Sequence, residues 1–465
     1  MPIAFKNTYA RLPESFFEKA EPTPVIQPSL IALNHELATE LGIDPGFLRS
    51  DEGLAILAGN SIPSGAEPLA MAYAGHQFGG FSPQLGDGRA ILLGETGGKD
   101  IQLKGAGQTP FSRRGDGRSA LGPVLREYLV SEAMHALGIP TTRALAAVLS
   151  GELVLREQPE KGGIFTRVAS SHLRIGTAQY FAARGDTDSL KALVGYAIQR
   201  HDPEATDAFE LFQSVIAKQA RLVAQWMGVG FIHGVMNTDN MSLSGETIDY
   251  GPCAFMDRFN PAQKFSYIDQ NGRYAYANQP GIAQWNLTRL AEALLPLFHD
   301  DQEKAVTMAK GELENFPDLF DSAYFKIFSK KIGLPENYDR ELIQILLDLM
   351  ATQKADFTLT FRGLANGPDA FLSNFGDQEP VRDWLARWNA AGNPDTTLMK
   401  TVNPAYIPRN HRIEEVIEAA KQGDFAPFHE IHSILREPYQ DKDGFEKYQQ
   451  TPSPDEVVCN TFCGT

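Results

Sequence analysis

Short apolar runs with glycine at their ends characterise the chain between about residues 70 and 155. Their lengths and boundaries predict β-strands. The runs are GRAILLGE at 88–95, DIQLKG at 100–105, ELVLRE at 152–157 and GIFTRVA at 163–169. Among them, residues 119–138 instead place apolar side chains at helical spacing, and Gly138 follows as a stop signal. This part of the sequence therefore predicts several strands around one helix.

Helical spacing dominates after about residue 185. Over 204–227 the apolar residues recur at steps of three and four, which predicts one amphipathic helix. They are Phe209, Phe212, Ile216, Ala220, Val223 and Met227. Later helices are expected at 284–298, 340–353, 380–391 and 412–421.

This order of elements predicts an α+β fold with a small strand-rich lobe followed by a larger helical lobe. We expect an N-terminal extension over 1–70, the strand-rich lobe over 71–160, the helical lobe over 161–435 and a polar tail over 436–465. A cleft between two such lobes is a common place for a nucleotide to bind.

Composition and charge narrow the class of protein. A chain of 465 residues exceeds one ordinary domain, and its 43% hydrophobic and 22% charged residues are typical of a soluble globular protein. The net charge of −16 is a poor match for nucleic acid, although a local positive pocket for phosphates is compatible with it. Without a signal peptide or a long apolar stretch, we expect a cytoplasmic protein with no membrane partner.

Three polar residues stand out in HGVMNTDNMSLSGETIDYGP at 233–252. Asn240 and Asp249 offer the oxygen ligands that Mg²⁺ prefers, and Asp239 has the chemistry of a base for an incoming hydroxyl. The alternative is a turn rich in Asn and Asp followed by a strand.

Lys104 ends a predicted strand and faces away from Ile101 and Leu103, so it can reach nucleotide phosphates. A carboxylate must fix it, and Glu127 on the next predicted helix is the preferred candidate over Glu132. Otherwise Lys104 is a solvated residue at a sheet edge.

Further phosphate ligands are suggested by glycines and arginines. The tetrapeptide GDGR occurs at 86–89 and again at 115–118, and glycine lets backbone N–H groups approach phosphates. Two tight turns are the alternative. Arg167 and Arg174 favour a polyphosphate as ligands, or they are surface charges.

These motifs occur in an order that resembles the SelO (YdiU) family of protein adenylyltransferases, whose members resemble protein kinases in fold. The resemblance covers nearly the whole chain. It is carried by QLKGAGQTPFSRRGDGR at 102–118, LREYLVSEAMHALGIPTTRAL at 125–145, HGVMNTDNMS at 233–242, IDYGPCAFMD at 248–257, GRYAYANQP at 272–280 and NPAYIPRNH at 403–411.

The resemblance implies a role for each matching position. Lys104 corresponds to the phosphate-binding lysine of kinases and Glu127 to its partner. Asn240 and Asp249 correspond to the metal ligands for Mg²⁺ or Mn²⁺, and Asp239 to the base. The implied nucleotide contacts are Gly86, Gly88, Arg89, Lys104, Asp116, Gly117, Arg167 and Arg174.

The resemblance also implies a reaction. Val235 stands where kinases carry their catalytic aspartate, and in this family the nucleotide lies flipped, with its α-phosphate toward the acceptor. The expected activity is transfer of AMP from ATP to Ser, Thr or Tyr hydroxyls of proteins, this protein included, with release of pyrophosphate. The alternatives are Mn²⁺-dependent transfer of UMP, an ordinary protein kinase, a sugar or antibiotic kinase, and a non-catalytic nucleotide-binding scaffold.

The chain has three cysteines, Cys253, Cys459 and Cys463, which is no secreted disulfide framework. Cys463 resembles the position where eukaryotic members of the family carry selenocysteine. A disulfide between the tail and the region of Cys253 would gate the cleft. The alternative is a free thiol in the tail and a small buried residue at 253.

Overall fold

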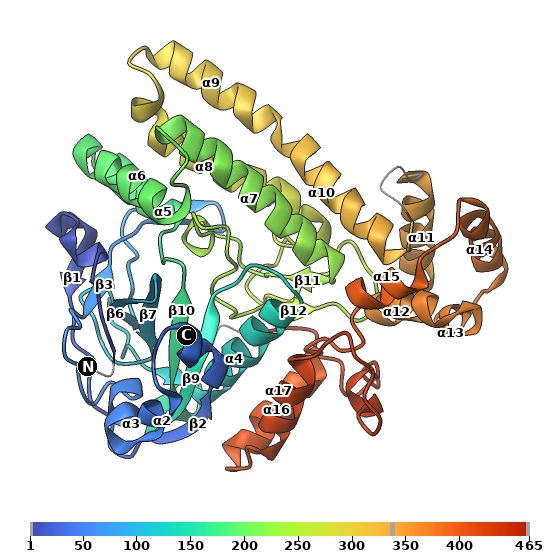
Figure 1. The fold of residues 1–465 in the computed structure, drawn as a ribbon, viewed down its shortest axis with the longest axis horizontal. Helices are drawn as coiled ribbons and strands as arrows, with labels where there is room; N and C mark the ends of the chain where they lie inside the picture. Colours follow the sequence, from blue (N-terminus) through green and yellow to red (C-terminus); the bar gives the residue numbers. More distant parts are fainter. Residues whose placement is uncertain (1–2, 335–339, 462–465) are drawn as a thin grey trace.

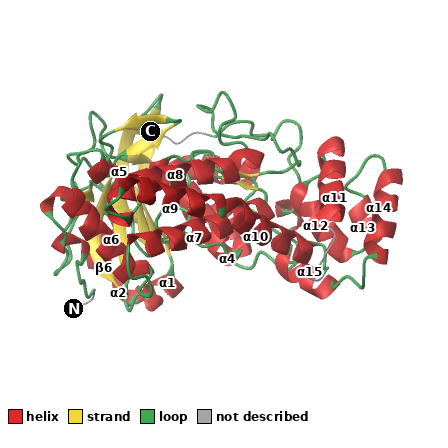
Figure 2. Cartoon of the chain, turned by 90° about the horizontal axis from the view of Figure 1, so that it is seen from above, coloured by secondary structure: helices red, strands yellow, loops and turns green. Residues whose placement is uncertain are grey.

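An antiparallel sheet lies at one end of the protein, and helices make up the rest (Figures 1 and 2). The computed structural model describes residues 3–334 and 340–461. Along the sheet, the strands are β1 (Phe17–Lys19), β3 (Leu69–Met71), β6 (Ala90–Thr96), β7 (Lys99–Lys104), β10 (Pro159–Ala169), β9 (Arg143–Leu155) and β2 (Ser29–Leu33), with β8 (Ser119–Ala120) paired to β10. The four predicted strands are confirmed, although β9 begins earlier than expected.

The two faces of the sheet are covered by different helices. Ile91 and Leu103 pack against the helices α1 (His35–Glu40), α2 (Pro45–Arg49) and α3 (Asp51–Leu57). On the opposite face, Phe165 packs with α4 (Leu121–Ala136), the helix predicted over 119–138. The other side of α4 contacts α16 (Asn410–Lys421) and α17 (Ala426–Leu435), so a late part of the chain returns to the sheet (Figure 1).

A long buried helix, α7 (Ala208–Gly228), organises the helical part. Its first turn is capped by Asp207, which accepts hydrogen bonds from two backbone N–H groups, and its predicted apolar stripe faces the core. The helices packed near it are α5 (Ile175–Ala182), α6 (Thr187–His201), α8 (Gln279–Phe298), α9 (Gln302–Glu314) and α10 (Phe316–Lys331).

The remaining elements lie at the far end of the helical part or in connections (Figure 1). The far helices are α11 (Arg340–Gln353), α12 (Phe357–Asn366), α13 (Pro368–Leu372), α14 (Glu379–Ala390) and α15 (Thr396–Val402). The short elements are β4 (Gly75–Gln77), β5 (Gly80–Ser82), β11 (Phe231–Ile232), β12 (Ala254–Phe255), η1 (Tyr9–Arg11), η2 (Glu14–Phe16), η3 (Thr238–Asn240), η4 (Tyr276–Asn278) and η5 (Glu446–Tyr448). The protein is α+β, as predicted. None of the described helices has the length and apolar character needed to span a membrane.

Candidate active site

The loop from His233 to Met241 carries Asp239 and Asn240. It follows β11, and β11 pairs with β12, so the start of the loop lies close to the segment that carries Asp249. The imidazole of His233 is buried, with Nε2 2.9 Å from the carbonyl oxygen of Ile248. This contact ties the loop with Asp239 and Asn240 to the residue just before Asp249.

Three cations converge on the carboxylate of Asp249. Lys104 Nζ lies 2.9 Å and Arg167 NH1 2.7 Å from Oδ1, while Arg174 NH1 lies 3.1 Å from Oδ2. Burial alone would raise the pKa of Asp249, but these charges outweigh it and hold the pKa well below its usual range. Asp249 also has a φ of +64°, a left-handed conformation that is strained for a non-glycine residue.

Glu127 is the partner of Lys104, as predicted. Its Oε2 lies 2.6 Å from Lys104 Nζ, and its Oε1 lies 3.4 Å from Arg167 NH1. Glu132 instead binds Arg143 and the backbone N–H of Ala144. Lys104 lies on an interior strand between β6 and β10 and is 9% exposed, so it is not a solvated edge residue.

Arg174 connects this cluster to the residue predicted as the base. Its NH1 donates both to Asp249 and, at 2.8 Å, to the backbone carbonyl of Asp239. Asp239 is itself buried, which raises the pKa of its carboxyl to about 6. Oδ2 accepts a hydrogen bond from Gln77 at 3.2 Å, and Oδ1 is buried without a hydrogen-bond partner in the described part of the chain. Oδ1 of Asp239 therefore has a hydrogen-bonding capacity that no described residue uses.

Both GDGR tetrapeptides lie beside the loop that follows Lys104. The backbone N–H of Gly105 donates to the carbonyl of Arg89 at 2.7 Å, and that of Gly107 donates to Gly117 at 3.1 Å. Gly117 has a φ of +67°, and a Cβ there would lie 2.0 Å from the carbonyl oxygen of Gly107. Only glycine fits this crossing.

The glycines of the first tetrapeptide, at 86–89, are packed as tightly as Gly117. In the second tetrapeptide, Asp116 points away from the cluster around Asp249. Gly86 has a φ of +68°, and a Cβ there would meet the Phe111 ring at 2.2 Å. Gly88 accepts a hydrogen bond from the hydroxyl of Ser112. The exposed carboxylate of Asp116 pairs with Arg156 at 2.8 Å and does not contact the cluster around Asp249.

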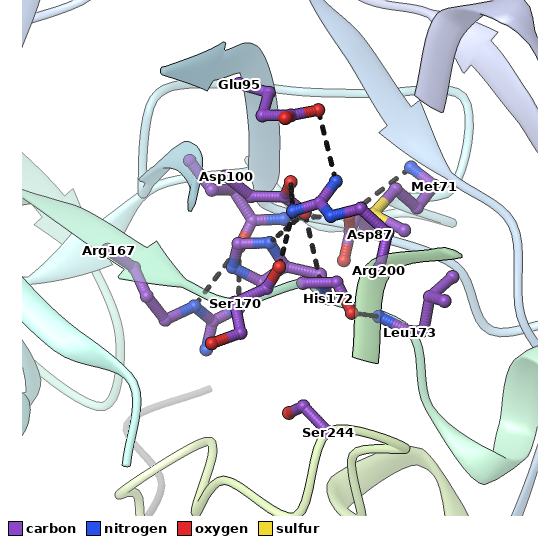
Figure 3. Close-up of polar contacts among 12 residues, drawn as sticks. Met71, Asp87, Glu95, Asp100, Arg167, Ser170, His172, Leu173, Arg200 and Ser244 are labelled. Carbon is purple, nitrogen blue, oxygen red and sulfur yellow. Dashed lines mark hydrogen bonds and ion pairs between the residues drawn. The ribbon is translucent and has the colours of Figure 1, made fainter. Parts of the chain in front are cut away.

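A buried polar network fixes the loop between Arg167 and Arg174 (Figure 3). Asp100 accepts a hydrogen bond from the backbone N–H of His172 at 3.2 Å, and the imidazole Nδ1 of His172 also lies 3.2 Å from its carboxylate. The same carboxylate pairs with Arg200 at 3.0 Å. Arg200 also pairs with Glu95 at 3.2 Å. The sequence does not predict this network, because its members are far apart in the chain.

Two further residues of the site were also missed. Asp87, within the first GDGR, is buried and accepts from Gln102 Nε2 at 2.9 Å; Gln102 in turn accepts from Arg167 at 2.6 Å. Gln102 precedes Lys104 by two positions on β7, so the alternation of the strand places both side chains on one face. The alternation of β7 therefore could have predicted that Gln102 belongs to the site.

Asn240 and Asp249 fit the requirements of a hard divalent cation. The amide nitrogen of Asn240 donates to the carbonyl of Val235 at 3.0 Å, which leaves its side-chain oxygen as a ligand. Asp249 contributes a partly exposed carboxylate. Among the described residues no group of three or more His, Cys, Asp or Glu is arranged to hold a metal ion. An ion bound here would complete its coordination with phosphate or water oxygens.

The C-terminal tail reaches the neighbourhood of Cys253. The hydroxyl of Thr461 donates to the carbonyl of Pro252 at 2.6 Å, and Cys253 is fully buried. Cys459 is exposed and forms no disulfide with another described residue, and Cys463 lies outside the described residues. The tail therefore runs past the residue predicted as its redox partner, and the pairing itself stays a prediction.

Comparison with known proteins identifies the family of the chain. The model of the family described as protein adenylyltransferase SelO matches residues 1–436. The protein nucleotidyltransferase YdiU of Rhizobium etli is 57% identical over 488 residues, which cover 100% of this chain and 97% of the relative. That of Bradyrhizobium diazoefficiens is 56% identical over 485 residues, which cover 99% of both chains. On this agreement along its whole length, the chain belongs to the SelO family and is a nucleotidyltransferase.

Proposed function

We propose that this enzyme transfers AMP from ATP to Ser, Thr or Tyr hydroxyls of protein acceptors and releases pyrophosphate. The convergence of Lys104, Arg167 and Arg174 on Asp249 is the observation that carries this proposal. The same cations also pair with Glu127 and Asp87, so the charges of the cluster are nearly balanced. A divalent cation bound at Asp249 would add the positive charge that a polyphosphate needs, and the arginines offer it fixed hydrogen-bond donors. The buried contacts of Arg167 and Arg174 keep both guanidinium groups in place for it.

The proposal includes a kinase-like, two-lobed fold. A lysine on an interior strand paired with a glutamate on the helix behind the sheet, facing an Asp-Tyr-Gly segment from the helical part, supports it. The proposed division of the chain is an extension over 1–70, a small lobe over 71–160, a helical lobe over 161–435 and a tail over 436–465. In this cleft the nucleotide lies flipped, with its β- and γ-phosphates toward the arginines.

In the proposed reaction, the acceptor oxygen attacks the α-phosphorus in line, and the bond from that phosphorus to pyrophosphate breaks. The hydroxyl proton passes to the carboxylate of Asp239, whose Oδ1 has no other partner. Lys104, Arg167 and Arg174 stabilise the charge that develops on pyrophosphate. Mg²⁺ or Mn²⁺ held by Asn240 and Asp249 would supply further neutralisation of the phosphates.

The first test compares the labels on the nucleotide. The purified protein is incubated with a generic protein acceptor and with ATP labelled at the α- or the γ-phosphate, or with α-labelled UTP, in Mg²⁺ or Mn²⁺. Asp249→Ala removes the proposed metal ligand. Asp188→Ala is the control, because that side chain is 97% exposed and its one ion pair among the described residues is with Lys191 on its own helix.

Transfer from α-labelled ATP alone, lost in Asp249→Ala and kept in Asp188→Ala, is the expected result. Label from γ-labelled ATP would identify a kinase, and a preference for UTP with Mn²⁺ would identify uridylyl transfer. Nucleotide binding without any transfer would favour a scaffold.

A further inference from the structure

The hairpin of β4 and β5 lies over the loop that carries Asp239. The backbone N–H of His76 donates to the hydroxyl of Thr238 at 2.7 Å, and Gln77 donates to the carboxylate of Asp239. The next residue, Phe78, donates its backbone N–H to Asn237 at 3.1 Å. The tip of the hairpin is therefore fixed next to the proposed base.

A surface hollow of about 520 Å³ opens at this tip. Phe78 forms one wall; the residue is 37% exposed, and the centre of its ring lies 5.3 Å from that of Tyr274 in an edge-on contact. Ile282 adds apolar surface, while Asn271 and Arg273 supply polar groups. The hollow has the size and mixed lining of a site for one or two side chains of a bound polypeptide.

Arg273 is a cation of this hollow without a counter-charge. Its guanidinium lies 4.8 Å from the centre of the Trp285 ring and 5.7 Å from that of Tyr274. Its Nε is buried without a hydrogen-bond partner, and no carboxylate in the described part of the chain lies within ion-pair distance of it. The carboxylate of Asp269 instead accepts the backbone N–H groups of Arg273 and Tyr274, both at 2.8 Å.

We infer that this hollow binds the acceptor polypeptide, and that Arg273 selects an acidic side chain close in sequence to the modified hydroxyl. The inference rests on the proposed function and names the class of substrate. Tyr274, the neighbour of Arg273, donates its hydroxyl to Asn237 at 2.6 Å, two residues before Asp239, and successive Cα atoms are about 3.8 Å apart. An extended segment with its hydroxyl at Asp239 thus reaches Arg273 with a side chain a few positions away.

Labelled peptides separate binding from transfer. Each fluorescent peptide has a central Tyr in a neutral sequence, and a Glu is moved one position at a time to either side; matched peptides carry Lys or Gln instead. Anisotropy measures binding to the full-length protein with ATP present, and transfer from α-labelled ATP is measured on the same peptides. The variants are Arg273→Glu, Arg273→Lys and the control Arg49→Glu, which makes the same charge change at an exposed residue of α2.

We expect a Glu peptide at one or two adjacent positions to bind roughly tenfold more tightly than its Lys counterpart. Arg273→Glu should reverse the preference, Arg273→Lys should retain part of it, and Arg49→Glu should leave it unchanged, with ATP binding equal in all. Equal binding of Glu and Lys peptides to the unmodified protein, or an unchanged preference in Arg273→Glu, would overturn the inference. A binding preference without transfer of label would leave the docking site standing and refute the adenylyl transfer.

Discussion

At the scale of single residues, Asp249 is the charge on which the site depends. Its carboxylate is the shared counter-ion of Lys104, Arg167 and Arg174, two of which are almost completely buried. Removing one partner of a buried ionic cluster costs more than the pair contributes, because the remaining charges stay desolvated and unpaired.

Asp249→Asn should therefore destabilise the nucleotide-free protein by about 3 kcal/mol. Inorganic triphosphate should restore much of this stability, since an anion can replace the missing carboxylate among the cations. Thermal unfolding with and without triphosphate measures both effects, with Asp188→Asn as the control. An equal stabilisation of all three proteins by triphosphate would show that the anion does not replace the missing carboxylate of Asp249.

At the scale of elements, long periodic segments could be predicted and short ones could not. α7 and α4 have enough turns for their apolar spacing to be recognised, and β7 has the alternation that places Lys104 on the site face. By contrast α5 has only eight residues, and the β4–β5 hairpin has three in each strand. Such short elements depend on contacts with distant residues, such as the hydrogen bond from Gln77 in β4 to Asp239.

The packing of α10 against α12 contains a buried charge. Lys331 is 2% exposed, and its Nζ lies 4.4 Å from the centre of the Phe361 ring. Burial lowers the pKa of Lys331 to about 7. Because an unfolded lysine titrates near 10.4, the folded state binds this proton less well than the unfolded state between these two pH values.

Lys331→Met should raise the free energy of unfolding at pH 7 by about 1–3 kcal/mol. The gain should shrink as the pH rises toward 10, because the unmodified protein becomes more stable when the unfolded lysine also loses its proton. Urea unfolding at several pH values measures this, with Lys330→Met as the control on the same helix. A loss of stability, or a gain that does not depend on pH, would contradict the expected cost of burying this charge.

At the scale of the whole molecule, acid sensitivity arises from histidines held neutral in different regions. Burial, assisted by the charges of Arg200 and Lys218, lowers the pKa of His201 to about 4. Burial likewise lowers the pKa of His432 to about 4. Each folded pKa lies below the unfolded value of about 6.5, so stability is lost as the pH falls from 6.5 to 4.

Between pH 7 and pH 5 the two histidines together should cost about 3 kcal/mol. The double variant His201→Gln/His432→Phe lacks both groups, so its stability should fall less over this range. Comparing urea unfolding of the two proteins isolates the histidines, because Asp239 and every other titrating group is present in both. Parallel pH profiles would show that these imidazoles do not control acid stability.

Much of the site could be predicted from the sequence, because its motifs are local. Lys104, Glu127 and Asp249 were named from patterns within a few residues of each and meet in the structure as expected. Asp87 and Asp100 were missed because their importance comes from Arg174 and Arg200, which approach them only in the folded chain. Asp116 lies in a motif but forms an exposed ion pair with Arg156.

The return of the C-terminal helices to α4 has a consequence for synthesis of the protein. Arg126, next to Glu127, donates to Asn410 at 2.8 Å, a residue 284 positions later. A ribosome adds that length of chain in roughly a quarter of a minute to a minute. Throughout that interval the helix that carries Glu127 lacks its outer cover. The Lys104–Glu127 pair therefore gains the full packing of its helix only after the segment around Asn410 has been synthesised.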